Sequence, residues 1–167
     1  MYRKRSLLAA IVAIAAAYLA GEVAAEQITG GSTADRLVGG SRADEIKGRD
    51  GRDTLIGRGG HDELVGGDGA ERLIAGNGDG DQIRAGYGAD LARGGKGGDL
   101  IYGGRGDDEL FGNEGADIIA GAAGNDRIDG GPGSDRIRCG PGDDAVVADP
   151  TDVLDPDCER LIPMRTG

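Results

Sequence analysis

The chain has 167 residues, of which 35 are glycine, one is phenylalanine and none is tryptophan. So few large apolar side chains exclude a conventional globular core, and a formal net charge of -11 excludes the basic surface that nucleic-acid binding needs. A glycine content this high is typical of collagen, of a disordered linker or of a periodic solenoid, and the spacing of the glycines distinguishes these classes.

The first 25 residues have the pattern of a secretory signal peptide. A basic segment (3–5) precedes an apolar stretch (7–20), and small residues (23–25) follow. Because the apolar stretch is shorter than the roughly 20 residues that cross a bilayer, we expect cleavage after Ala25 rather than a retained membrane anchor. The mature chain is therefore expected to be secreted and extracellular, with no membrane span and a short lead over 26–29.

Residues 30–147 divide into thirteen consecutive units of nine residues, except that the unit 75–84 has a tenth residue, either Asp79 or Gly80. The sixth position is acidic and the eighth is aliphatic in every unit, while the fourth is glycine in all units except the first two, which carry Thr33 and Arg42. The glycines predict tight turns, and the last three positions of each unit predict a short strand with one inward side chain. The pattern predicts a solenoid whose strands stack the aliphatic residues into a thin core and whose turns stack the acids.

Stacked carboxylates require cations. The sixth-position acids are Asp35, Asp44, Asp53, Asp62, Glu71, Asp81, Asp90, Asp99, Asp108, Asp117, Asp126, Asp135 and Asp144. Without residues 1–25, which hold three basic residues and one acidic residue, the net charge is -13, so these thirteen acids account for all of the uncompensated charge. Carboxylate and carbonyl oxygens, with no His or Cys at matching spacing, favour Ca²⁺ over transition metals and over the smaller Mg²⁺.

The units resemble G-G-x-G-x-D-x-U-x, the calcium-binding nonapeptide of the repeats-in-toxin (RTX) family. The resemblance covers 30–147, and the closing segment 139–160 is similar to the end of small secreted actinobacterial RTX-like proteins. It implies an all-β parallel β-roll with two units per turn, in which several calcium ions are each shared between loops eighteen residues apart. One edge would then carry Asp108 and Asp126 and the other Asp99, Asp117 and Asp135, with loop carbonyls around Arg105, Asp107, Pro132 and Ser134 completing the metal shells.

The metal ligands that the resemblance implies are Asp53, Asp62, Asp81, Asp90, Asp99, Asp108, Asp117, Asp126, Asp135 and Asp144. Weaker binding is expected at Asp35 and Asp44, whose loops contain Thr33 and Arg42 in place of glycine, and at Glu71, whose extra methylene displaces the carboxylate by over ~1 Å.

The two cysteines are predicted to form a disulfide. Cys139 and Cys158 are the only cysteines of a chain expected to reach an oxidising compartment, which favours a bridge over two free thiols. The bridge would hold the C-terminal cap and tail (148–167) over the end of the roll and shield its last strand.

The expected function is calcium ion binding by a secreted β-roll that folds on binding Ca²⁺, without enzymatic activity. His61, the only histidine, lies at a variable loop position, and neither HExxH nor GxSxG occurs. The acid pairs, such as Asp107 with Asp108, each place a sixth-position acid beside a variable residue. The alternatives are a small polysaccharide-acting β-solenoid enzyme and a module for adhesion to a surface or glycan. The sequence does not specify a protein or glycan partner.

Overall fold

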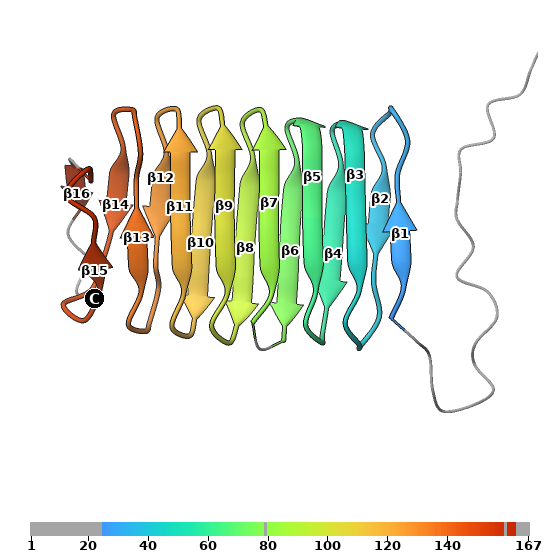
Figure 1. The fold of residues 1–167 in the computed structure, drawn as a ribbon, viewed down its shortest axis with the longest axis horizontal. Helices are drawn as coiled ribbons and strands as arrows, with labels where there is room; N and C mark the ends of the chain where they lie inside the picture. Colours follow the sequence, from blue (N-terminus) through green and yellow to red (C-terminus); the bar gives the residue numbers. More distant parts are fainter. Residues whose placement is uncertain (1–24, 79, 159, 163–167) are drawn as a thin grey trace, which may run out of the picture.

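The computed structural model describes residues 25–78, 80–158 and 160–162, which form a parallel β-solenoid of two facing eight-stranded sheets (Figure 1). Successive strands alternate between the sheets, so odd-numbered strands make sheet A and even-numbered strands make sheet B. The predicted all-β parallel β-roll is thus confirmed. The predicted signal peptide lies outside the described residues except for Ala25, and the described part contains no helix long and apolar enough to span a membrane.

The strands are short because each unit supplies only a few extended residues between two turns. Sheet A contains β1 (Gln27–Thr29), β3 (Glu45–Gly51), β5 (Glu63–Gly69), β7 (Gln82–Tyr87), β9 (Leu100–Arg105), β11 (Ile118–Ala123), β13 (Arg136–Arg138) and β15 (Val153–Leu154). Sheet B contains β2 (Arg36–Val38), β4 (Thr54–Arg58), β6 (Arg72–Asn77), β8 (Leu91–Lys96), β10 (Glu109–Glu114), β12 (Arg127–Asp129), β14 (Ala145–Val147) and β16 (Arg160–Ile162).

Paired strands are two units apart along the chain. Ile46 pairs with Leu64 at a separation of eighteen residues, and Leu64 pairs with Ile83 at nineteen. The extra residue of the unit 75–84 is therefore absorbed in the loop before Asp81, and the register of both sheets is kept. Two units make one turn of the solenoid, as the resemblance to the RTX repeat implies.

The core is one aliphatic side chain thick on each sheet. The eighth-position residues are buried from Leu37 through Val146, and Ala92 is buried among them where the other units place larger side chains. Small residues at the first position, Ala75 and Ala85, add to this core. The inward position of every predicted strand is confirmed.

Glycine at the fourth position is required by the turn that precedes it in the stack. A Cβ atom at Gly115 would lie 1.8 Å from the carbonyl oxygen of Gly97, one turn earlier, and the φ of Gly115 is 144°. A Cβ atom at Gly60 would likewise lie 2.5 Å from the carbonyl oxygen of Arg42. Arg42 and Thr33 belong to the first turn, where the described chain places no earlier loop against them, so a side chain is tolerated there.

The stacked strands continue beyond 30–147. β1 pairs with β3 before the first predicted unit, while β15 and β16 pair with β13 and β14 after the last. The predicted disulfide between Cys139 and Cys158 is confirmed, with the two Cα atoms 5.1 Å apart. The segment expected to cap the roll therefore adds a final turn of its own.

Candidate metal centre

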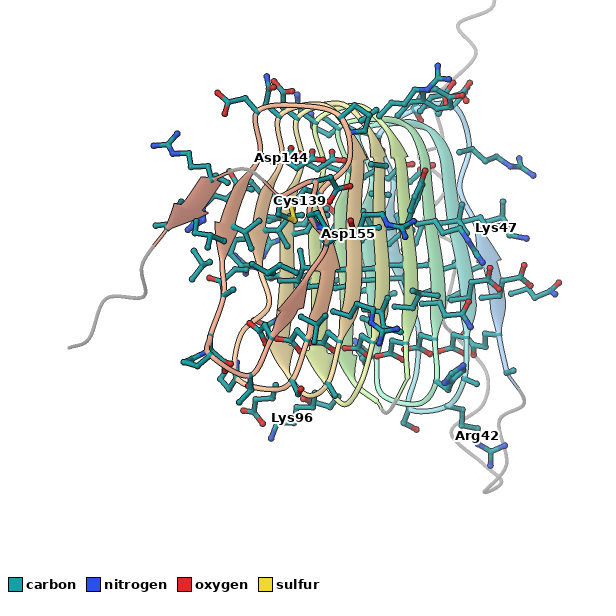
Figure 2. The ribbon with its side chains drawn as sticks, turned by 60° about the vertical axis from the view of Figure 1, so that its left-hand side comes forward. Arg42, Lys47, Lys96, Cys139, Asp144 and Asp155 are labelled. Carbon is teal, nitrogen blue, oxygen red and sulfur yellow. A yellow bond between two sulfur atoms is a disulfide. The ribbon has the colours of Figure 1, made fainter. Side chains whose placement is uncertain are left out.

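The sixth-position acids form two rows, one at each edge where the chain passes between the sheets (Figure 2). Loops that run from sheet A to sheet B carry Asp35, Asp53, Glu71, Asp90, Asp108, Asp126 and Asp144. Loops that return to sheet A carry Asp44, Asp62, Asp81, Asp99, Asp117 and Asp135. The predicted division of the acids between two edges is therefore found, and every acid in these rows except Asp35 is buried.

One carboxylate oxygen of each aspartate after the first accepts a backbone hydrogen bond within the stack. The backbone N–H of Asp90 donates to Oδ1 of Asp108 at 2.9 Å, and the N–H of Asp108 donates to Oδ1 of Asp126 at 2.9 Å. The same bond joins Asp99 to Asp117 and Asp117 to Asp135, each at 2.8 Å, on the other edge. A backbone donor one turn earlier therefore fixes the orientation of each of these carboxylates.

The second oxygen of most of these carboxylates is buried without a hydrogen-bond partner among the described residues. This holds for Oδ2 of Asp53, Asp62, Asp90, Asp108, Asp117, Asp126, Asp135 and Asp144, and for both side-chain oxygens of Glu71. Native proteins rarely leave buried polar atoms unpaired, because each costs about 1–3 kcal/mol and more when it is charged. The rows therefore present negative oxygens that need a proton or a cation.

Burial raises the pKa of these carboxyl groups. The pKa reaches about 6 for Asp62, Asp126 and Asp135 and about 7 for Asp108, and in each case loss of solvation is the largest cause and repulsion from neighbouring carboxylates adds to it. Among the described residues the ion pairs lie elsewhere: Lys47 with Glu45, Arg84 with Glu63 and Arg138 with Asp155 on sheet A, and Lys96 with Glu114 at the ends of β8 and β10. Basic side chains therefore do not neutralise Asp108 or its neighbours.

Loop carbonyls lie in the same turns as the acids. The carbonyl oxygens of Arg105 and Pro132 accept the N–H groups of Gly88 and Gly115, at 2.8 and 3.1 Å. Each carbonyl oxygen retains a second lone pair. A set of carboxylate and carbonyl oxygens, without thiolate or imidazole, is the donor chemistry that Ca²⁺ prefers, so the residues present fit this ion.

Comparison with known families agrees with this donor set. A family model described as the RTX calcium-binding nonapeptide repeat matches residues 29–64, 48–80, 76–110, 84–119 and 111–146, which together span most of the chain. The chain belongs to the RTX calcium-binding nonapeptide-repeat family. No curated protein matches it.

The first turn of the RTX roll satisfies its carboxylates internally. Gly31 N–H donates to Oδ2 of Asp35 at 2.7 Å, and Gly40 N–H donates to Oδ2 of Asp44 at 2.6 Å. Oδ1 of Asp44 also accepts the N–H of Glu26 at 2.9 Å, and Asp35 is only partly buried, so neither acid has the buried unpaired oxygen found in later turns.

The last turn of the RTX roll also uses protein donors, around Asp152, an acid that the repeat alignment missed. Its Oδ1 accepts Asp135 N–H at 2.9 Å and its Oδ2 accepts Asp149 N–H at 2.7 Å, while the Thr151 hydroxyl donates to the Gly133 carbonyl. The D-x-U pattern of Asp152, Val153 and Leu154 is the signal that could have found it.

Glu71 interrupts the hydrogen-bonded row. No donor within the described part of the chain reaches either of its carboxylate oxygens, whereas the neighbouring Asp side chains of the row accept a hydrogen bond from the preceding turn. Burial raises the pKa of Glu71, and the nearby charge of Asp90 raises it further. The extra methylene thus moves the carboxylate away from the position that an aspartate occupies.

A second cluster, Cys139, Asp157 and Cys158, has its sulfur atoms in the disulfide. Asp157 accepts the N–H groups of Cys139 at 3.3 Å and Gly140 at 3.1 Å. The cluster therefore fastens the final turn to the roll and offers no thiolate to a metal.

Proposed function

We propose that the chain is a secreted calcium-binding protein whose β-roll folds as Ca²⁺ binds. The observation that carries the proposal is the set of buried carboxylate oxygens that have no donor. The proposed ligands are Asp53, Asp62, Asp81, Asp90, Asp99, Asp108, Asp117, Asp126, Asp135 and Asp144. Glu71 is a weaker ligand because its carboxylate is displaced, and Asp35 and Asp44 contribute least because their own loops already satisfy them.

In this proposal each carboxylate has two tasks. One oxygen holds the backbone N–H of the preceding turn, as in the bond from Asp90 to Asp108, and the other is directed to the ion together with loop carbonyls. Bound calcium would supply the positive charge that the rows lack. The loop residues orient oxygens and exclude water, and the proposal assigns no catalytic step to them.

Coupling of binding to folding follows from the thin core. Each strand buries essentially one aliphatic side chain, so hydrophobic burial per ordered residue is small. Stacking the loops also removes ionised carboxylates from water, which opposes folding. Cation binding that is confined to the stacked form therefore becomes folding free energy.

The test is a calcium titration followed by far-ultraviolet circular dichroism at pH 7.5. We expect little strand signal in chelator and a cooperative gain in millimolar Ca²⁺. Asp108→Asn should raise the calcium concentration at the midpoint several-fold, because the neutral amide is a weaker ligand. Asp107→Asn, at the exposed neighbouring position, serves as the matched control and should leave the midpoint nearly unchanged.

Asp35→Asn provides an internal comparison, and its effect should be smaller than that of Asp108→Asn. A full strand signal in chelator at this pH, or equal midpoints for Asp108→Asn and Asp107→Asn, would contradict the proposal.

A further inference from the structure

The outer face of sheet A changes character along the roll. Near its N-terminal end the exposed side chains are polar and form ion pairs, Lys47 with Glu45 and Arg84 with Glu63. From β7 onward large apolar side chains are also exposed, alongside arginines such as Arg105, Arg136 and Arg138. The apolar side chains are Leu100 (43%), Tyr102 (47%), Ile118 (50%), Tyr87 (54%) and Val153 (56%).

These side chains form one continuous patch, because the register places them in adjoining rows. Leu100 pairs with Ile118, Ile118 with Arg136, and Arg136 with Val153. Tyr102 continues a second row on the same face. We call this surface the sheet A patch. It extends over five strands, about 19 Å at the usual strand spacing, and up to about 16 Å along them.

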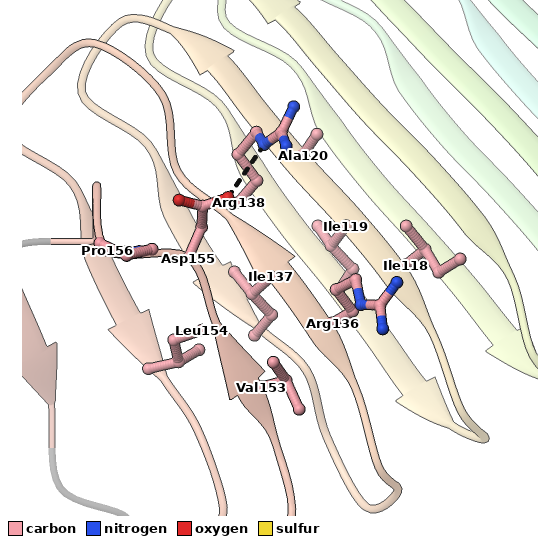
Figure 3. A pocket seen from close by; sticks show the side chains of 10 residues that line it. All are labelled: Ile118, Ile119, Ala120, Arg136, Ile137, Arg138, Val153, Leu154, Asp155 and Pro156. Atoms are coloured by element: carbon pink, nitrogen blue, oxygen red, sulfur yellow. Dashed lines mark hydrogen bonds and ion pairs between the residues drawn. The ribbon is translucent and has the colours of Figure 1, made fainter.

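Arginine side chains lie within the patch. Arg136 lies in the same row as Ile118 and Val153, on the middle strand of a shallow groove formed by β11, β13 and β15 (Figure 3), and no acidic side chain of the described residues pairs with it. The guanidinium of Arg105 lies over the ring of Tyr87, 5.4 Å from its centroid. The groove also contains Asp155, whose carboxylate pairs with Arg138, so the patch combines apolar contact surface with the unpaired positive charge of Arg136.

The area of the patch indicates which kind of molecule can bind there, a protein partner or a narrow polymer. An area of about 300 Å² is well below the roughly 800 Å² per partner that a stable protein interface buries. A second copy of the chain would also bring another unpaired Arg136 to the same surface, and its charge would remain uncompensated. A narrow, extended molecule with apolar ring faces and regularly spaced anionic groups fits better.

We infer that the sheet A patch binds an acidic polysaccharide of the polyuronate type. The Arg136 guanidinium would pair with a sugar carboxylate, a geometry for which its planar fork is suited. Tyr102, Ile118 and Leu100 would contact the apolar faces of the sugar rings. A polymer lying across the strands would follow these rows and meet the side chains of the next strand at each strand spacing, about 4.8 Å.

The inference rests on the proposed function in one respect, namely that calcium neutralises the acid rows. In the ionised form these rows would repel an acidic polymer, and screening at physiological ionic strength acts only over about 8 Å. Binding is therefore expected in the calcium-loaded form.

The experiment measures binding of a hexameric oligouronate to the full chain by calorimetry in saturating Ca²⁺, after circular dichroism has verified folding of each variant. Arg136→Gln and Ile118→Thr should each weaken binding, with a loss of roughly tenfold or more for Arg136→Gln because a charged hydrogen-bonded pair is removed. Arg36→Gln, at the equivalent strand position on sheet B, is the matched control and should change affinity less than twofold. A neutral oligosaccharide of equal length should bind at least tenfold more weakly.

Several outcomes would overturn the inference. They are a calcium-folded chain that does not bind the oligouronate at millimolar concentration, equal affinities for Arg136→Gln and Arg36→Gln, and a concentration-dependent dimer that Ile118→Thr abolishes. Equal affinities would mean that the uronate is held through calcium ions elsewhere on the roll. Failure of the proposed function is distinguishable, because the strand signal itself would then be insensitive to calcium.

Discussion

In the absence of calcium, protonation of the buried carboxyl groups is expected to stabilise the folded roll. The pKa of an aspartate in an unfolded chain is about 3.9, whereas burial raises it to about 6 for Asp62, Asp126 and Asp135 and to about 7 for Asp108. The folded form therefore binds more protons than the unfolded form. Its stability in the absence of metal is lost as the pH rises through 6 to 7 and is fully present only below about pH 4.

The size of this effect follows from the shifts. Raising the pKa of one carboxyl group by about two pH units corresponds to about 3 kcal/mol of unfolding free energy. Solvent screening by water close to the loops reduces this contribution to roughly 1–2 kcal/mol for each group. Four such groups together give a change of several kcal/mol between pH 8 and pH 5, comparable with the whole stability of a small domain.

The assay is far-ultraviolet circular dichroism in chelator between pH 8 and pH 5, above the sequence pI of about 4.5. We expect the strand signal to rise as the pH falls, with a midpoint near pH 6. Asp108→Asn should move the midpoint to higher pH, because one buried carboxyl no longer needs a proton, whereas Asp107→Asn should move it slightly to lower pH, because the Asp107 charge helps to raise the pKa of Asp108 and Asp126. A signal that is flat or falls with acid, or an Asp108→Asn midpoint displaced to lower pH, would refute the reasoning.

Three further predictions concern the backbone, the bridge and the irregular unit. Ala122 has a φ of 84°, so Ala122→Gly should stabilise the calcium-bound form by up to about 1 kcal/mol. Gly115→Ala should instead destabilise this form strongly, because the added Cβ atom would clash with the carbonyl oxygen of Gly97. Thermal unfolding in saturating calcium compares the two variants, and a Gly115→Ala variant as stable as the unaltered chain would contradict this geometry. Cys158→Ser should cost roughly 3 kcal/mol of unfolding free energy, measured by urea denaturation, and thiol titration of the denatured unreduced chain should detect no free thiol. Glu71 and Ala92 are expected to weaken the middle of the roll, so limited proteolysis across a calcium titration should cut first near 75–93 and leave a resistant C-terminal fragment. Glu71→Asp should increase the protection of the N-terminal half. If both halves of the unaltered chain become protected at the same calcium concentration, Glu71 and Ala92 do not weaken the roll.

The repeat predicted the fold because each position of the unit has one physical task. The eighth position predicted the core and the sixth predicted stacked acids, whereas the two-unit turn and the division of the acids between two edges came from the resemblance to the RTX repeat. The strands β1, β15 and β16 were outside the predicted roll because their residues lack the glycine loop that defines a unit. Asp152 was missed for the same reason, although its role in the stack equals that of Asp135.

Other features depend on spatial relations that a linear alignment does not contain. The weaker binding predicted for the loops of Thr33 and Arg42 stays a prediction, but only the structure shows that these residues lie in the first turn, where no described loop opposes a side chain. The partition of each carboxylate into a paired and an unpaired oxygen depends on the register between turns. The sheet A patch combines seventh- and ninth-position residues of alternate units with Tyr87, at a third position, and Val153, beyond the last unit, and these positions follow no repeat pattern.

Alternation of the sheets limits how this array can change its length during evolution. Loss of a single nine-residue unit upstream of Leu100 would leave the core and acid patterns intact, yet it would reverse the facing of every later strand relative to the earlier ones. Leu100, Ile118 and Val153 share a face because they lie on β9, β11 and β15, all odd-numbered strands of sheet A. A deletion or duplication within this group would transfer part of the surface to the opposite side of the molecule. Repeats can therefore be gained or lost without scrambling the outer surfaces only in pairs, which makes the eighteen-residue turn, rather than the nonapeptide, the heritable building block.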